Sequence, residues 1–348
     1  MKHLHQARLA TITALIVVLG NVPAQAEVRV GGFTELKFYA TDDENASPSS
    51  GFREGQFVLH LNSALSDQMS VFAEITWTPK ADGFSTEIER AIFKYEYSDA
   101  LKASGGRFHT RTSWWNAAFH HGSWLQTSVD RPIAIKFGSK FVPVHFVGAM
   151  AEGRFFPGGF SISYAGGVGN GRDEIIGRAG DAGDVNNHRA LLLHLAFRHD
   201  AFYDLQIGGA AYVDRVPIES EPDLDEQIFS AFLVLSKETP EILGEFFFVR
   251  HQDDFTGNDT ENTSYYVQIA YRLPWVGERF KPYARYEDMD IDGQDRAFAG
   301  VVPDLNRFVA GIRFDFATMA AIKLEGRRFS ENDGDDINEI YAALNFVF

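Results

Sequence analysis

The residues best able to do chemistry in this sequence are three histidines, about one third of the way along the chain. His109, His120 and His121 could act as metal ligands, because neutral imidazole nitrogens bind divalent transition metals. Side chains of adjacent residues in extended chain point to opposite faces, so His120 and His121 would not share one ion. No further ligand follows at a spacing typical of metal sites. We therefore expect no metal site and expect these histidines to pack within their loop.

Other chemical motifs are weaker. Gly167-Val168-Gly169-Asn170-Gly171 is similar to a phosphate-binding loop, but no helix opens after it, as a dinucleotide fingerprint requires. Cysteine is absent, which excludes disulfides, thiolate zinc sites and cysteine nucleophiles. The chain has 48 acidic and 32 basic residues, and this net charge of −16 argues against a nucleic-acid partner. We expect no catalytic residues and no cofactor.

The pattern around these residues is that of strands. Apolar residues recur at every second position, as in Phe308, Ala310, Ile312 and Phe314. Turn-forming residues separate sixteen such segments, which predicts an all-β fold. The expected strands span residues 28–40, 52–63, 69–79, 87–97, 102–111, 142–154, 160–168, 188–199, 203–215, 226–237, 241–251, 263–273, 280–289, 306–316, 320–330 and 337–348.

The connectors between these strands alternate between long and short. The long ones are near 41–51, 80–86, 112–141, 169–187, 216–225, 252–262, 290–305 and 331–336. This alternation, with an even strand number, is typical of a transmembrane antiparallel up-and-down β-barrel. Aromatic residues near the short turns match an interfacial girdle, although such residues also favour strands in general. They are Tyr97, Phe160, Tyr203, Trp275, Phe280, Phe316 and Phe348.

In a barrel the polar face of each strand lines the lumen. In the register read from the sequence, inward-facing bases outnumber inward-facing acids, which would favour anions inside low-dielectric walls. The alternative is a set of paired charges that rigidify the wall with little selectivity. The bases expected to line the pore are Arg90, Lys94, Arg107, Arg111, Arg285, Arg313, Lys323 and Arg327.

Residues 1–26 have the features of a cleaved secretory signal peptide. Lys2 and Arg8 precede a short apolar stretch at 12–19, and Ala24-Gln25-Ala26 supplies a small-x-small cleavage site. The apolar stretch is too short for a membrane anchor. We expect a signal peptide over 1–26 and a barrel domain over 27–348, with the long loop 112–141 inserted in it.

The last expected strand, Ile340 to Phe348, resembles the C-terminal assembly signal of Gram-negative outer-membrane barrels. Apolar residues recur at Ile340, Ala342, Leu344 and Phe346, and Phe348 follows. Together with the leader and the strand series, the closest resemblance is to the 16-stranded general or phosphate-type porins. It implies an outer-membrane location, recognition of Phe346 and Phe348 by the barrel-assembly machinery, and a homotrimer.

The longest connector, 112–141, lies about where porins carry a loop that folds inward and narrows the channel. A long loop in a compact fold is usually functional or disordered, and its tryptophans argue against disorder. The alternative is an extracellular flap or part of a trimer contact. The constriction residues expected on this loop are Trp114, Trp115, His120, His121, Trp124 and Arg131.

The function that follows is passive diffusion of small hydrophilic solutes or ions through a water-filled channel, with some preference for anions. Outer-membrane lipid and lipopolysaccharide are the expected surroundings. Acidic clusters in the outer connectors could bind divalent cations that bridge to lipopolysaccharide, or could form a solvated rim. The alternatives are a barrel enzyme of phospholipase or protease type, a non-conducting binding or structural barrel, and a soluble periplasmic binding protein.

Overall fold

The computed structural model describes residues 27–348 except 121, 137–139, 203, 219–220 and 332–333. The signal peptide predicted over 1–26 lies outside the described residues. Within the described ranges, no helix is both long and apolar enough to span a membrane.

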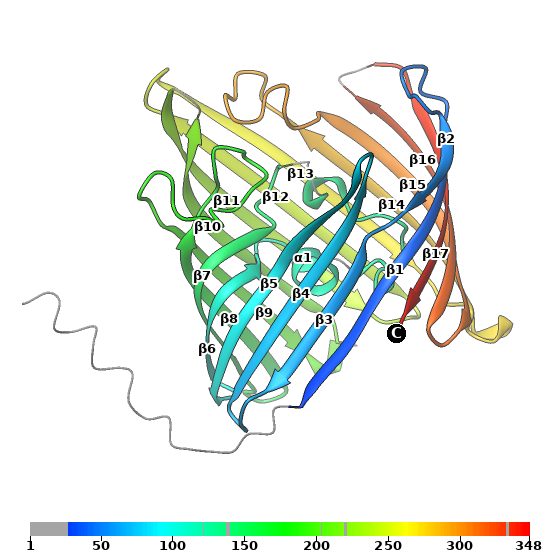
Figure 1. Ribbon diagram of the computed structural model, residues 1–348, viewed down its shortest axis with the longest axis horizontal. Coiled ribbons are helices and arrows are strands. Elements are labelled where there is room, and N and C mark those ends of the chain that lie inside the picture. The colour runs from blue at the N-terminus through cyan, green and yellow to red at the C-terminus, as the bar shows by residue number, and fades with distance from the viewer. Residues whose placement is uncertain (1–26, 121, 137–139, 203, 219–220, 332–333) are drawn as a thin grey trace, which may run out of the picture.

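Every predicted strand is present, and the fold class is confirmed. The strands are β1 (Val28–Thr41), β2 (Ser50–Glu54), β3 (Phe57–Ala64), β4 (Met69–Lys80), β5 (Gly83–Ser98), β6 (Leu101–His109), β7 (His145–Phe155), β8 (Phe160–Asn170), β9 (Ala190–His199), β10 (Gln206–Ile218), β11 (Glu221–Ser236), β12 (Glu241–Asp253), β13 (Asn258–Ala270), β14 (Phe280–Asp290), β15 (Leu305–Ala317), β16 (Ala320–Glu331) and β17 (Ile337–Val347). β2 and β3 both pair with β1 and together form the second predicted strand. The result is a closed antiparallel barrel of sixteen strands (Figure 1).

Short helices interrupt the connectors. They are α1 (Trp114–Phe119), η2 (Ile133–Ile135), η3 (Asp200–Phe202) and η4 (Pro274–Val276). Figure 1 shows α1 inside the ring of strands rather than on its surface.

The two faces of the sheet differ as the alternating pattern predicts. On β9, Leu191, Leu193 and Leu195 are exposed, whereas Leu192 and His194 between them are buried. Exposed apolar side chains of this kind recur on strands all round the barrel. A water-soluble protein rarely shows so extensive an apolar surface, but the lipid-facing side of a membrane barrel requires one.

Three connectors predicted to be long are tight instead. Residues 80–86, 216–225 and 252–262 belong largely to the hairpins β4–β5, β10–β11 and β12–β13, whose strands stay paired almost to their tips. The alternation of apolar residues stops where the outer face of the barrel reaches water. The strands continue beyond that point, because polar residues also form the backbone hydrogen bonds of a β-ladder. Sequence periodicity therefore underestimates the length of these strands.

The barrel closes where β1 meets β17. Phe33 pairs with Val347, and the ladder continues to Thr41 opposite Glu339. The N–H of Gly32 donates to the carbonyl of Phe348 at 3.0 Å, and the N–H of Phe348 donates to the carbonyl of Gly32 at 3.0 Å. The Phe348 ring stacks on Phe57, with centroids 5.5 Å apart. Phe348 thus joins the end of β17 to β1 across the seam and reaches β3 on the far side of β1.

Deleting Phe348 is expected to impair barrel assembly, because it removes two seam hydrogen bonds and the stack on Phe57. The measurement is the fraction of outer-membrane protein whose mobility on SDS gels changes on heating. Phe316→Ala is the matched control, since Phe316 is an exposed phenylalanine on β15, away from the seam. Equal folded fractions for both variants would contradict a special role for Phe348.

Candidate channel constriction

The connector between β6 and β7 folds into the barrel. It spans residues 110–144 and contains α1 and η2. Trp115 is fully buried, and Ala134, Ile135 and Phe141 form part of the same apolar cluster as residues of the wall. The apolar side chains of this loop therefore pack against the inner face of the wall.

Carboxylates of the wall accept hydrogen bonds from the backbone of this loop. Glu245 on β12 accepts from the N–H groups of Trp114 and Trp115 at 2.6 and 3.0 Å. Glu287 on β14 accepts from Ile133 N–H at 2.5 Å, and Glu325 on β16 accepts from Val129 N–H at 2.8 Å. The first N–H groups of a helix have no partner within it, so Glu245 satisfies the start of α1.

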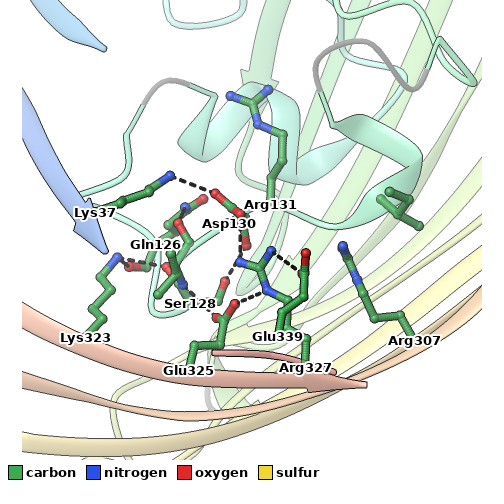
Figure 2. Close-up of polar contacts among 12 residues, drawn as sticks. Lys37, Gln126, Ser128, Asp130, Arg131, Arg307, Lys323, Glu325, Arg327 and Glu339 are labelled. Atoms are coloured by element: carbon green, nitrogen blue, oxygen red, sulfur yellow. Dashed lines mark hydrogen bonds and ion pairs between the residues drawn. The ribbon is translucent and has the colours of Figure 1, made fainter. Parts of the chain in front are cut away.

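Cationic side chains of the wall donate to the carbonyls of the same loop. Lys323 Nζ donates to the carbonyls of Ser123, Gln126 and Ser128, at 2.5, 2.8 and 2.8 Å (Figure 2). Arg313 donates to the carbonyls of Trp124 and Gln126 at 2.6 and 3.1 Å.

Arg285 continues this row of donors on β14. It donates to Ser128 Oγ at 2.7 Å and to the Asp130 carbonyl at 3.1 Å. The basic residues of β14, β15 and β16 therefore hold the loop against one wall.

Asp130 links this wall to β1, which lies beyond β17 across the seam of the barrel. Its carboxylate lies 2.8 Å from Lys37 Nζ on β1 and 2.7 Å from Arg327 Nη2 on β16 (Figure 2). Burial alone would raise the pKa of the Asp130 carboxyl, but the charges of Lys37 and Arg327 hold that pKa well below its usual value. Asp130 therefore stays ionised and ties the loop to β1 and β16, the strands on either side of β17.

The eight bases expected to line the pore separate into two groups. Arg285, Arg313, Lys323 and Arg327 are buried beneath the loop, so they contact the loop rather than an open channel. Arg90, Lys94 and Arg107 lie on β5 and β6, and Arg111 follows β6 at the start of the loop; their side chains are 26, 33, 13 and 34% exposed. Only this second group faces accessible space to any extent.

The second group is paired with acids, as the alternative reading of the lumen charges anticipated. Arg90 lies 2.6 Å from Glu74, and Arg107 lies 2.7 Å from Asp181. Lys94 lies 3.3 Å from Glu152, which Arg111 also contacts. Two cations therefore share the single carboxylate of Glu152.

The residues predicted for the constriction loop have mixed surroundings. Trp115 and His120 are buried, Trp114 and Trp124 are half-buried, and His121 lies outside the described residues. Arg131 is buried too, and its guanidinium donates to the carbonyls of His120 and Ile135 at 2.5 and 3.3 Å. Most of these side chains thus build the loop itself.

Water-accessible space remains beside the loop. A cavity of about 350 Å³ lies between the loop and the wall formed by β1 to β4, and both signs of charge line it. Its charged residues include Lys37, Arg53 and Lys136 together with Glu35, Glu54 and Asp130. A smaller cavity of about 150 Å³ beside α1 is lined by Arg90, Lys94, Arg111 and Glu152.

Sequence reasoning missed several residues of this site. The loop-binding roles of Glu245, Glu287 and Glu325 were not predicted; the register read from the sequence places these three only among the inward-facing acids. Glu89 and His145 were not considered at all, and they lie with His109 and His120 in one buried cluster. His145 lies inside the predicted strand 142–154, close to its start, whereas nothing in the alternating pattern points to Glu89.

Comparisons with solved structures identify the fold. An anion-selective porin from Comamonas acidovorans matches with a TM-score of 0.66 and 12% identity, over 93% of this chain and 100% of that one. Salmonella typhi OmpF in complex with daunomycin matches with a TM-score of 0.64 and 11% identity, over 93 and 98% of the two chains. OmpT of Vibrio cholerae, an outer-membrane protein in its trimer form, matches with a TM-score of 0.58 and 12% identity, over 93 and 99%.

No protein-family model and no curated protein matches the sequence. The fold of the chain is that of Gram-negative outer-membrane porins, as the sequence predicted. The barrel and its structural neighbours also agree with the predicted outer-membrane location.

Replacing Lys323 by methionine is expected to loosen the loop. It removes three hydrogen bonds and takes their donor from the carbonyls of Ser123 and Ser128, at a cost of about 1–3 kcal/mol for each buried group, whereas the Gln126 carbonyl keeps Arg313. The measurement is backbone hydrogen exchange over residues 122–131, which should be faster in the variant. Lys80→Met is the matched control, because Lys80 is an exposed lysine at the tip of the β4–β5 hairpin. Unchanged exchange in Lys323→Met would show that the loop is held by other contacts.

Proposed function

We propose that this barrel is a porin that lets small hydrophilic solutes and ions diffuse passively across the outer membrane. The observation that supports the proposal most directly is the polar, charged loop 110–144 held inside a lipid-exposed barrel of sixteen strands. A barrel of this size is wide enough to enclose an aqueous channel. The loop narrows it, so solutes would pass between the loop and the β1–β8 side of the wall.

We propose a modest preference for anions. Its support is the cavity beside α1, where Arg90, Lys94 and Arg111 are partly exposed and Glu152 is shared by two of these cations. The bases of β14 to β16 contribute less, because the loop carbonyls cover them. The larger cavity contains acids and bases in similar numbers, so the expected selectivity is weak.

An enzymatic role has less support from the geometry. His251 is the histidine with the most obvious acid partners, since its two ring nitrogens lie 2.7 Å from Asp295 and 3.1 Å from Glu226. An imidazole bonded to a carboxylate on each side has no nitrogen left to activate a serine, which nucleophilic catalysis needs. This arrangement fits a structural ion cluster within the barrel.

The surroundings and partners follow from the same proposal. The exposed apolar belt would contact lipid, and the chain would form a homotrimer, as one structural neighbour does. The barrel-assembly machinery would recognise Phe346 and Phe348, at the C-terminal end of β17. Divalent ions between acidic outer loops and lipopolysaccharide remain part of the proposal, although Arg296 already neutralises Glu221 and Asp253 there.

The test is single-channel current of the purified protein in a planar bilayer under a salt gradient. Steady conductance with a reversal potential of the anion-selective sign is expected. Lys94→Gln combined with Arg111→Gln should move that potential towards cation selectivity, because Glu152 loses both of its cations. Lys80→Gln combined with Arg328→Gln removes as much charge at exposed positions and should move it less. A folded, inserted barrel without conductance would refute the porin proposal and favour an enzyme or a binding barrel.

A further inference from the structure

Four buried side chains meet where the loop 110–144 leaves and rejoins the wall. Glu89 comes from β5, His109 ends β6, His120 follows α1 and His145 begins β7. One potential ligand atom from each residue lies within 4.8 Å of the others. His109 and His145 are paired across the β6–β7 ladder, so their side chains lie on the same face of the sheet.

Glu89 reaches this cluster because of a β-bulge. Arg90 pairs with Glu74, but the next pair along the β4–β5 ladder joins Ile88 to Ile75, so Glu89 is an extra residue. Glu89 is consequently buried in the lumen, although strict alternation with Arg90 would turn it towards lipid. Bulges that redirect one side chain in this way are common next to functional sites.

Surrounding groups orient the four side chains. Asn116 Oδ1 contacts His120 Nδ1, which favours a proton there and turns Nε2 towards Glu89, 3.9 Å from its Oε2. Asn116 is itself fixed, since its Nδ2 donates to the carbonyls of Thr110 and Val144 at 3.0 Å. Outer partners of this kind set the tautomer and direction of metal-binding histidines.

Glu89 is oriented in the same way. Thr76 Oγ1 donates to Glu89 Oε1 at 3.1 Å, which leaves Oε2 directed at His145 Nε2, 2.7 Å away. The carboxylate and the imidazole nitrogens therefore converge on one point.

We propose that Glu89, His109, His120 and His145 bind one divalent transition-metal ion, with Zn²⁺ as the expected occupant. Three imidazole nitrogens and one carboxylate oxygen form a donor set that suits four-coordinate zinc. Four protein ligands in a buried position leave no site for substrate, so the ion would be structural. It would join α1 and both ends of the loop to β5. This proposal reverses the expectation from the sequence, which considered ligand spacing within one segment only.

The charged groups around the cluster are compatible with ligation. Glu74 Oε2 lies 3.5 Å from His109 Nε2 and adds a second carboxylate next to the ion. Three guanidiniums, those of Arg90, Arg107 and Arg131, also lie nearby. Each has acceptors other than the Glu89 carboxylate: Glu74 for Arg90, Asp181 for Arg107, and the carbonyls of His120 and Ile135 for Arg131. Glu89 can therefore bind a cation while these guanidiniums keep a partner.

The test is a Co²⁺ titration of the full mature protein, folded, without an affinity tag and freed of metal by chelator. One equivalent of Co²⁺ should bind with the intense visible absorption of four-coordinate cobalt, and Zn²⁺ should displace it. His120→Gln should weaken Co²⁺ binding by at least about tenfold. His194→Gln is the matched control, because His194 is another buried lumen histidine, on β9, stacked against Phe232.

Heat-dependent gel mobility shows which variants are folded, and the wild-type titration tests the proposal even where His120→Gln does not fold. Absence of the cobalt absorption in folded wild-type protein would overturn the metal site. Equal binding by His120→Gln and His194→Gln would overturn the assignment of its ligands. Neither readout involves conduction, so the result is independent of the porin proposal.

Discussion

The structure depends on how the backbone N–H and C=O groups of a long connector find hydrogen-bond partners inside a barrel. The N–H and C=O groups of the buried part of this connector lose water when they pack against the wall, and an unpaired buried group is costly. The wall supplies both kinds of partner in rows. Carboxylates of β12, β14 and β16 accept from loop N–H groups, while Lys323, Arg313 and Arg285 donate to loop carbonyls. Ionised partners form stronger hydrogen bonds than neutral ones, so few residues hold a long segment.

This arrangement makes the lumen asymmetric. Charges on β14 to β16 are used to bind the loop, so they are screened by its dipoles and lie out of reach of a passing ion. Charges on β5 and β6 stay partly exposed, and in the proposed channel they would determine the field that a solute meets. A count of inward-facing charges treats both groups alike, and it therefore overstates the basic character of the open space. In the proposed channel, selectivity would depend on which wall the loop covers.

Much of the fold could be predicted from the sequence because a membrane barrel imposes alternation on every strand. Leu191, Leu193 and Leu195 must be apolar to meet lipid, and the period of two follows from strand geometry alone. The inward orientation of Lys323 and Arg285 follows from the same register. Their partners do not, because the loop carbonyls that they bind are separated from them by more than 150 residues. The length of the strands at the hairpin tips was underestimated, because these residues lie outside the lipid and need not be apolar.

The cluster at the base of the loop shows a second limit of sequence reasoning. Alternation assigns Glu89 to the outer face, and the β-bulge formed by one extra residue in β5 reverses that assignment. His109 and His145 are 36 positions apart in number, yet they are neighbours because they end and begin strands that pair. A connector that is bound along one side by β12 to β16, and gathered at its two ends beside β5, has little freedom to swing. The width of the remaining space is therefore determined by the register of the barrel, and the loop behaves as part of its wall.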